Sequence, residues 1–207
     1  MIKTFIICAG KSERYSKPYP KNIELILGEP IYKRTIRLLN ENQINDISIT
    51  VSEENANYFD YENKIIGSNE REIDRFRNVR NYFEEALILY GDVIYHELDI
   101  KIILSNLNDE IKFFGRFPDL RYSPKKPFDE IYGVYISNKN KFFTAVDTVA
   151  SNFENKIHNR EIGLDVFNQL QIEKSDLITL SEYTDDIDIV ENYNEIKDLY
   201  ERGFNSC

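Results

Sequence analysis

Apolar and polar positions along the first 90 residues repeat with two different periods, and these periods predict strands and helices in turn. Short apolar or β-branched runs predict strands at 5–8, 47–51, 64–66 and 86–90, with a short extended segment at 23–27. The run at 86–90 is almost continuously apolar, as is typical of a strand at the centre of a parallel sheet. Helices are predicted over 31–42 and 70–84, with a short helix at 53–61.

The helix predictions depend on apolar residues that recur three and four positions apart. Ile31, Thr35 and Leu38 share one face of the helix over 31–42, and Pro30 stands at its first turn. A similar pattern in the helix near 70–84 consists of Ile73, Phe76, Val79, Tyr82 and Phe83. Strands that alternate with helices form right-handed βαβ units, so the pattern predicts an open α/β sheet.

The second half of the chain is more mixed. It predicts strands at 111–116, 130–136 and 176–180, helices at 98–107, 139–153 and 160–171, a proline-rich loop at 117–128, and a last helix that carries Tyr193 and Ile196 on one side. No repeat or linker divides the chain. We therefore expect a single domain over 1–207, in which a doubly wound, mostly parallel sheet is joined to a small mixed β part. We expect this domain to consist of two halves, residues 1–95 and residues 96–207.

Composition limits the location and the partners. No apolar run approaches the roughly 20 residues of a membrane helix, and the N-terminus lacks the pattern of a signal peptide, so we expect a cytoplasmic protein without membrane insertion. Cys8 and Cys207 give no disulfide framework. A net charge of −10 argues against nucleic acid as the main partner.

Positive charge is nevertheless concentrated in two places. Residues 11–37 hold seven Lys and Arg against three acidic residues, and residues 111–127 hold five against one. Two basic islands in an acidic chain suit a small anionic ligand better than a polymer. Solvated surface loops are the alternative explanation for each island.

The first island begins where a predicted strand ends. The run to Cys8 stops at Ala9-Gly10, where small residues let a ligand approach the backbone, and cations follow at Lys11 and Arg14. The stretch is not a P-loop, because that motif needs glycine at position 5, which is Phe5. The dinucleotide motif G-x-G-x-x-G is also absent.

Four separated motifs resemble those of the nucleotidyltransferases, which join a nucleoside triphosphate to a sugar phosphate or related phosphate. The motifs are Ile7-Cys8-Ala9-Gly10-Lys11-Ser12-Glu13-Arg14, then Pro20-Lys21 with Leu27-Gly28-Glu29-Pro30-Ile31, then Gly91-Asp92, and then Asp186-Ile187-Asp188-Ile189-Val190-Glu191-Asn192. Ser12 replaces a usual glycine, and Ile189-Val190 replaces Thr-Pro. Ala9-Gly10 is more similar to the cytidylyltransferases, which favours CTP.

The resemblance implies a Rossmann-like nucleotidyltransferase fold, in which residues 1–95 form the nucleotide-binding half and residues 96–207 form the acceptor-binding half with a closing metal-binding segment. It also implies a role for each matching residue. Lys21 and Arg14 would be catalytic, and Asp92 and Asp188 would hold Mg²⁺, with Asp186 as an alternative ligand. Nucleotide contacts are expected from Cys8, Ala9, Gly10, Lys11, Ser12, Arg14, Lys21, Gly67, Asp74, Arg75 and Gly91. Asp188 could instead cap the last helix, because Asp is favoured at that position.

The acceptor site is the least defined part of the prediction. Weak candidates are Arg116, Arg121, Glu130 and Tyr132. The loop at 117–128 could be a lid over the acceptor phosphate or the contact of a homodimer, and the sequence leaves both open.

The resemblance implies an Mg²⁺-dependent enzyme that transfers a nucleotidyl group from an NTP to a phosphorylated sugar, polyol or similar acceptor and releases pyrophosphate. Its expected pathway is capsule or other surface polysaccharide synthesis. A glycosyltransferase of related fold is one alternative, but Asp92-Val93-Ile94 lacks the D-x-D that it needs. A catalytically inactive nucleotide-binding module is the other.

Overall fold

A seven-stranded sheet runs through the centre of the computed structural model, which describes residues 2–10, 14–117, 129–157, 162–173 and 176–202. The strand order is β10-β8-β9-β6-β1-β4-β5. The strands are β1 Lys3–Ile7, β4 Ile47–Val51, β5 Lys64–Ile66, β6 Ala86–Tyr90, β8 Ile111–Arg116, β9 Glu130–Ile136 and β10 Ile178–Thr179. All neighbours pair in parallel except β9, which is antiparallel to both β6 and β8.

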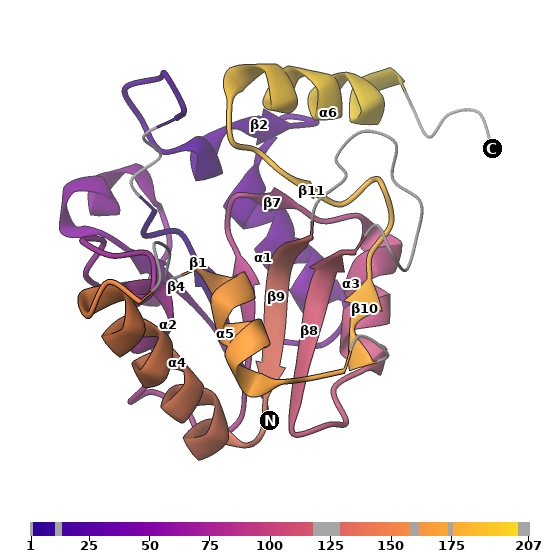
Figure 1. The fold of residues 1–207 in the computed structure, drawn as a ribbon. Helices are drawn as coiled ribbons and strands as arrows, with labels where there is room; N and C mark the ends of the chain where they lie inside the picture. The colour runs from indigo at the N-terminus through magenta and orange to yellow at the C-terminus, as the bar shows by residue number, and fades with distance from the viewer. Residues whose placement is uncertain (1, 11–13, 118–128, 158–161, 174–175, 203–207) are drawn as a thin grey trace.

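Helices cover both faces of this sheet (Figure 1). They are α1 Ile31–Glu41, α2 Asp74–Arg77, α3 Glu97–Ser105, α4 Lys139–Glu154, α5 Gly163–Leu170 and α6 Val190–Arg202, with 3-10 turns η1 Lys21–Ile23 and η2 Glu53–Tyr58. In Figure 1, α4 and α5 lie in front of the sheet, α1 lies behind it, and α6 crosses above its upper end. The predicted α/β fold with a doubly wound, mostly parallel sheet is confirmed.

The main core surrounds the two central strands. Phe5 and Ile6 in β1 and Leu87, Ile88 and Leu89 in β6 have no exposed surface, as expected for strands covered on both faces. A second, smaller apolar cluster lies beneath α6. It consists of Tyr15, Ile26, Ile31, Ile94, Ile187, Tyr193, Ile196 and Tyr200.

The predicted helix over 70–84 is wrong in its extent, because only α2 is helical and turns surround it. Ile73, Phe76 and Val79 are fully buried as the spacing predicted, but Tyr82 is exposed. After α2 the backbone bonds run three residues apart, from the Val79 N–H to the Phe76 carbonyl and from the Tyr82 N–H to the Val79 carbonyl, so the chain forms turns where an α-helix would continue. The side chains of Asp74 and Asn78 hold the segment before α2. The Asp74 carboxylate accepts from the Ser68 hydroxyl and the Arg71 N–H, and the Asn78 side chain accepts from the Ser68 N–H and donates to its carbonyl.

The extended segment at 23–27 is a hairpin rather than a strand of the main sheet. β2 Leu25–Ile26 pairs with β3 Glu29–Pro30 across a turn at Leu27 and Gly28, whose φ angles are 53° and 80°. Positive φ at both central positions is typical of a tight hairpin turn. The short helix at 53–61 is the 3-10 turn η2, and the strand at 176–180 is reduced to β10.

A two-stranded ladder that the sequence pattern did not indicate lies at the upper end of the sheet, where β7 Val93–Ile94 pairs antiparallel with β11 Asp185–Asp186. Within the described ranges, no helix is long and apolar enough to span a membrane. The boundary between a nucleotide-binding and an acceptor-binding half stays a prediction.

Candidate active site

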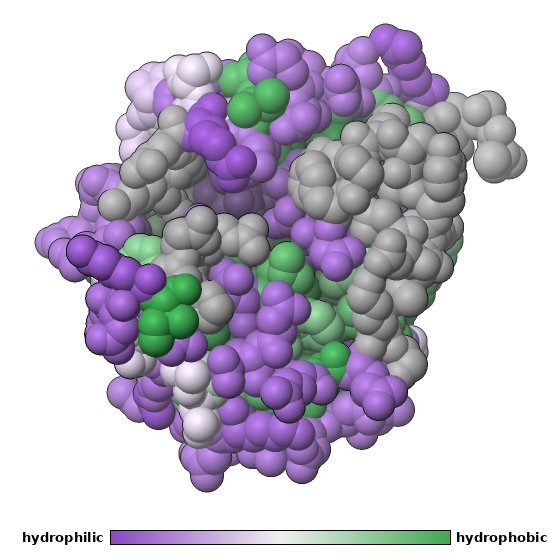
Figure 2. Space-filling model, viewed as in Figure 1, coloured by the Kyte–Doolittle hydropathy of each residue, from purple (hydrophilic) through white to green (hydrophobic). Residues whose placement is uncertain are grey.

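A pocket of about 850 Å³ opens at the edge of the sheet where β1 and β6 end. Parallel strands place their carboxyl ends at one edge, and this edge is the usual ligand site of open α/β sheets. The antiparallel strand β9 begins at this edge, so Glu130 joins Ala9, Gly10 and Asp92 around the pocket. Figure 2 shows a recess lined by hydrophilic residues on this face.

The β7–β11 ladder brings the end of the chain to this pocket. Asp186 is the register partner of Val93, and the Ile187 N–H donates to the Asp92 carbonyl at 3.0 Å. Asp188 follows directly. Its approach to Asp92 therefore depends on backbone pairing between segments about 90 residues apart in sequence.

Lys21 lies between the two aspartates. Its Nζ is 2.7 Å from Asp92 Oδ2 and 3.5 Å from Asp188 Oδ1, and only about a tenth of the side chain is exposed. Arg14 Nη2 donates to Asp188 Oδ1 at 2.9 Å from a largely exposed side chain. Four predicted site residues thus converge from three separate parts of the chain.

The charges in this cluster stabilise one another. Burial lowers the pKa of Lys21, but Asp92, Asp188 and Asp186 outweigh this effect and the net pKa is raised. Burial raises the pKa of Asp92, but the Lys21 ammonium outweighs it and the net pKa is lowered. Both groups are therefore charged at neutral pH.

The donor set of Asp92 and Asp188 fits a hard divalent cation. Their carboxylates already face cations, with Lys21 between them and Arg14 on Asp188, and Mg²⁺ in proteins is usually held by one or two carboxylates, water and substrate phosphates. Within the described ranges, no group of three or more His, Cys, Asp or Glu is arranged to hold a metal by itself. A two-carboxylate site is consistent with a cation that is also held by phosphate.

The small residues at the ends of β1 and β6 divide into two kinds. Ala9 and Gly10 line the pocket, and a Cβ added to Gly10 would meet nothing within 4 Å. Cys8 and Gly91 lie beneath it. Cys8 is fully buried, and a Cβ on Gly91 would lie 2.4 Å from its Sγ. Their contribution is therefore close packing of β6 on β1.

The segment after β5 forms another wall. Ser68, Asn69, Glu70, Arg71, Glu72 and Arg75 line the pocket. The Arg75 guanidinium stacks over the Tyr90 ring, 5.0 Å from its centroid. Gly67 packs against the Asn78 side chain and Asp74 holds Ser68 and Arg71, so these two predicted nucleotide contacts support the wall and do not line the pocket.

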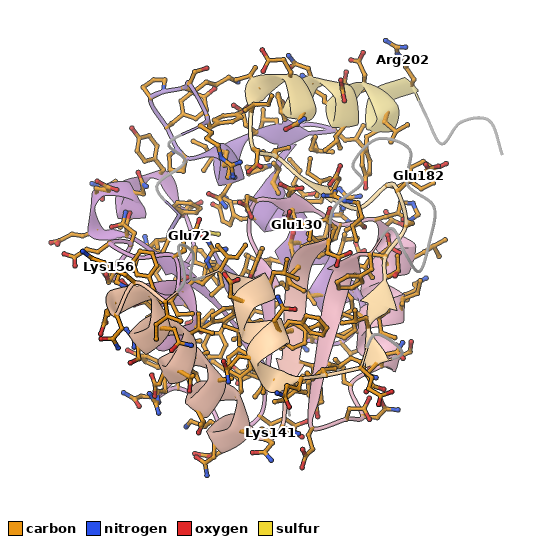
Figure 3. The ribbon with its side chains drawn as sticks, viewed as in Figure 1. Glu72, Glu130, Lys141, Lys156, Glu182 and Arg202 are labelled. Carbon is orange, nitrogen blue, oxygen red and sulfur yellow. The ribbon has the colours of Figure 1, made fainter. Side chains whose placement is uncertain are left out.

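Of the described acceptor candidates, Glu130 lines the pocket and Arg116 and Tyr132 do not. Arg116 Nη1 donates to Tyr132 Oη and to Asp185 Oδ1, both at 2.5 Å, and Tyr132 Oη donates to Asp185 Oδ1 at 2.6 Å. Arg116 and Tyr132 are buried in this network and do not line the pocket. Glu130 does, from the upper end of β9 (Figure 3).

Glu130 has an unusual charge environment. Burial and the nearby Asp186 raise its pKa to about 7, against the lowering effect of Arg116, whose Nη2 is 3.9 Å from Glu130 Oε2. A carboxyl with this pKa is only partly ionised at neutral pH. Its raised pKa reflects the other carboxylates around the pocket, among them Asp186, Asp188 and Asp92.

Three predicted residues, Lys11, Ser12 and Arg121, lie outside the described residues, as does most of the loop at 117–128. Pocket residues that the sequence did not indicate are Asn22, Ser68, Asn69, Glu70, Glu72, Tyr90, Asp129, Ile131, Ile162, Gly163 and Leu164. Of these residues, Asn22 could most readily have been predicted from the sequence, because it directly follows the Pro20-Lys21 motif. The α5 residues carry no motif and reach the pocket only through the fold.

Comparison with known proteins agrees with this architecture. No family model matches the chain. A bifunctional sugar-1-phosphate nucleotidylyltransferase/acetyltransferase from Sulfurisphaera tokodaii is 32% identical over 103 residues. This alignment covers 45% of the chain, which spans only a quarter of the length of that relative.

Solved structures match over nearly the whole chain. A glucose-1-phosphate thymidylyltransferase from Bacillus anthracis superposes with a TM-score of 0.67 at 12% identity, covering 96% of this chain and 95% of that one. The CTP:phosphocholine cytidylyltransferase of Streptococcus pneumoniae gives 0.64 at 14% identity, covering 96% and 98%. The UDP-glucose pyrophosphorylase of Acinetobacter baumanii gives 0.64 at 16%, covering 97% and 93%. The chain therefore has the fold of the sugar-phosphate nucleotidyltransferases and cytidylyltransferases, which confirms the resemblance that its motifs indicated.

Proposed function

We propose that this protein is a metal-dependent nucleotidyltransferase that transfers a nucleotidyl group from an NTP to a phosphorylated small acceptor and releases pyrophosphate. The observation that carries the proposal is the position of Lys21, whose ammonium faces Asp92 and Asp188 beside Arg14. The arrangement joins phosphate-binding cations to cation-binding carboxylates in one pocket. The fold and the 32% identical relative support the same reaction.

The chemistry needs positioning and charge neutralisation more than proton transfer. An acceptor phosphate oxygen, already anionic, attacks the α-phosphorus in line with the leaving pyrophosphate. Lys21 neutralises charge that develops around the α-phosphate, and Arg14 binds triphosphate oxygens as a planar fork. Ala9 and Gly10 leave room for the nucleotide against the end of β1.

Asp92 and Asp188 are the residues that would hold Mg²⁺. When bound, the metal supplies further neutralisation of the triphosphate charge. The triphosphate has to replace the present partners of Lys21 and Arg14, since both cations are paired with these carboxylates in the structure.

The acceptor lies, in this proposal, between Glu130 and the wall that carries Arg75. The partly ionised Glu130 carboxyl favours hydrogen-bond donors or positive charge on the acceptor, and the phosphate of the acceptor points toward Lys21. Arg116 and Tyr132 act indirectly, because Asp185 occupies them. We favour CTP as the donor because of Ala9-Gly10. We also favour a cytoplasmic location and a role in surface polysaccharide synthesis. A homodimer stays open.

The test is pyrophosphate release from each of the four NTPs against a panel of phosphorylated sugars, polyols and amino alcohols. Turnover should require a divalent cation and depend on one base and one acceptor class. A Lys21→Ala protein serves as the matched inactive control. Failure to release pyrophosphate with every combination, while CTP, UTP, GTP and ATP also fail to bind in calorimetry, would overturn the proposal.

A further inference from the structure

The opening loop, residues 14–20, carries Arg14 at one end and leads into Lys21 at the other, yet it lies outside the main sheet. Arg14, Ser16 and Pro18 are exposed. Among the described residues, the backbone bonds of the loop are short-range ones from the Lys17 N–H to the Tyr15 carbonyl at 2.8 Å and from the Ile23 N–H to the Pro20 carbonyl at 3.2 Å, and one from the Tyr58 hydroxyl of η2 to the Pro18 carbonyl at 3.3 Å. A loop with so little backbone pairing needs another anchor to keep Arg14 and Lys21 in place.

That anchor is the ammonium of Lys17. It contacts Glu24 Oε1 at 2.5 Å and lies over three tyrosine rings, 5.6 Å from the centroid of Tyr15, 5.5 Å from Tyr19 and 5.2 Å from Tyr193. Aromatic faces attract cations within about 6 Å of the centroid, most strongly where water is excluded. We call Tyr15, Tyr19, Tyr193 and Glu24 the tyrosine cage.

Burial and hydrogen bonds hold three of the cage residues, Tyr15, Glu24 and Tyr193. Tyr15 is 3% exposed and Glu24 is 6% exposed, and the Tyr15 hydroxyl donates to the same Glu24 Oε1 at 2.7 Å. The Tyr193 hydroxyl donates to the Leu25 carbonyl at 2.8 Å, which fixes α6 to β2 below it (Figure 1). Tyr15 and Tyr193 both belong to the apolar cluster beneath α6.

The cage therefore connects the two segments that meet in the active site. Lys17 is four residues before Lys21, and Tyr193 is five residues after Asp188. Arg14 and Lys21 reach Asp188 across this junction, at 2.9 Å and 3.5 Å. The burial of Tyr15 in the apolar cluster beneath α6 is a second connection between the opening loop and α6, and the cage adds a charged contact to it.

On the basis of the proposed function, we propose that Lys17 is a positioning residue for triphosphate binding: its ammonium, held in the tyrosine cage, aligns Arg14 and Lys21 with Asp188. Lys17 does not touch the substrate in this role. Misplacement of a binding group by about 1 Å can cost about 100-fold in rate, so a loosened loop should be costly although the fold remains.

The experiment compares Lys17→Met with the wild-type protein. The probes are CTP, UTP, GTP and ATP and their monophosphates, with affinities measured by calorimetry at fixed Mg²⁺. We expect Lys17→Met to lose about 10- to 100-fold in affinity for the triphosphate that the wild-type protein binds best. The corresponding monophosphate should lose less than about threefold, because Asp92 still holds Lys21 near the first phosphate, whereas Arg14 is expected to contact the phosphates beyond it.

Two further variants separate positioning from a general structural effect. Lys17→Arg keeps a cation that can bond Glu24 and stack on tyrosine, so it should restore triphosphate affinity to within about fivefold. Lys197→Met is the matched control. Lys197 belongs to α6, and its ammonium lies 5.8 Å from the centroid of the Tyr193 ring, but its contacts among the described residues are within α6 and do not reach the opening loop. Its nucleotide affinities should not change.

Loss of Lys17 leaves the Glu24 carboxylate buried beside Tyr15 without its cation, which can destabilise the protein. Lys17→Met/Glu24→Gln removes both charges, and we expect it to melt near the wild-type temperature while showing the same selective loss of triphosphate affinity. The inference is overturned if folded Lys17→Met or the double variant binds triphosphate as the wild-type protein does, or loses triphosphate and monophosphate equally. Failure of the wild-type protein to bind any triphosphate would overturn both the inference and the proposed function. It is distinguished from failure of the inference alone, in which the wild-type protein binds a triphosphate.

Discussion

Lys21 Nζ lies 2.7 Å from Asp92 Oδ2, so the lysine at the candidate catalytic position neutralises a candidate metal ligand. The same nitrogen is 3.5 Å from Asp188 Oδ1. Each of the three residues comes from a different part of the chain, and with Arg14, which pairs with Asp188, two cations face two carboxylates. The first two predictions concern the removal of the Lys21 charge from this cluster.

Replacing Lys21 with Met should raise the affinity of the nucleotide-free protein for Mn²⁺ by about tenfold or more. Two unit positive charges about 4 Å apart repel by roughly 1–4 kcal/mol, depending on solvent exposure, and a divalent cation doubles this repulsion. Mn²⁺ binding measured by electron paramagnetic resonance checks this. Lys33→Met, which removes an exposed lysine paired with Asp60, is the control and should leave Mn²⁺ affinity unchanged. Equal affinity in the Lys21→Met and wild-type proteins would contradict the prediction.

The same lysine should be needed for turnover. Lys21→Ala should lower the rate of pyrophosphate release by roughly 10²–10³-fold, which is the usual effect of removing one group that stabilises developing charge. Circular dichroism should show an intact fold, since Lys21 lies at the edge of the sheet. Unchanged pyrophosphate release would show that the ammonium has no catalytic role.

Asp92→Asn should abolish the Mg²⁺ dependence of nucleotide binding. The amide keeps the size of the side chain but removes the charge that a hard cation requires. Calorimetric titration of the triphosphate with and without Mg²⁺ measures the effect, with Asp60→Asn at an exposed position as the control. Normal metal-dependent affinity in Asp92→Asn would exclude Asp92 as a ligand.

Two glycines at the same sheet edge should respond in opposite ways to alanine. Gly91→Ala places a Cβ 2.4 Å from Cys8 Sγ and 2.8 Å from the Ile7 carbonyl, and such overpacking typically costs about 1–3 kcal/mol of unfolding free energy. Gly10→Ala meets nothing within 4 Å, so its stability should stay within about 0.5 kcal/mol while its triphosphate affinity falls. Urea denaturation and calorimetry distinguish the two. Equal stability of both variants would show that the close packing of β6 on β1 is not essential.

Glu130 should make stability depend on pH. Its pKa is raised to about 7 in the folded protein, against about 4.3 in an unfolded chain. Between these values the folded state holds a proton that the unfolded state has lost, so the unfolding free energy decreases as pH rises from about 4.5 to 7 and then levels off.

Glu130→Gln removes this titration. A tenfold difference in proton affinity between the folded and unfolded states corresponds to about 1.4 kcal/mol, but the side chain is about a third exposed and solvent screens it, so we expect the variant to be about 1 kcal/mol more stable than the wild-type protein at pH 8. At pH 4 the two should agree, because the wild-type carboxyl is then largely protonated in the folded state. Denaturation in EDTA across pH 4–8 measures the difference, and parallel curves would rule out the raised pKa.

Local sequence was sufficient for the fold class and for most elements. The apolar run in β6, the helical spacing in α1 and the β-branched run in β4 each show the type of element within a few residues of sequence, and the structure has all three where the pattern placed them. The motif residues at Arg14, Lys21, Asp92 and Asp188 could likewise be named, because the family resemblance covers them. Local pattern failed over 70–84, where the backbone after α2 forms turns with bonds three residues apart and does not continue as a helix.

Only the tertiary structure decided which of the named residues meet. Pairing of β11 with β7 brings Asp188 to Lys21, and an antiparallel β9 brings Glu130 to the pocket, whereas Asp185 draws Arg116 and Tyr132 away from it. The tyrosine cage likewise joins Tyr193 to Lys17 from opposite ends of the chain. Sequence periodicity reports which face of an element is buried, but contacts between distant segments depend on register and on competition for the same charged partner. Both are settled only when the whole chain has folded.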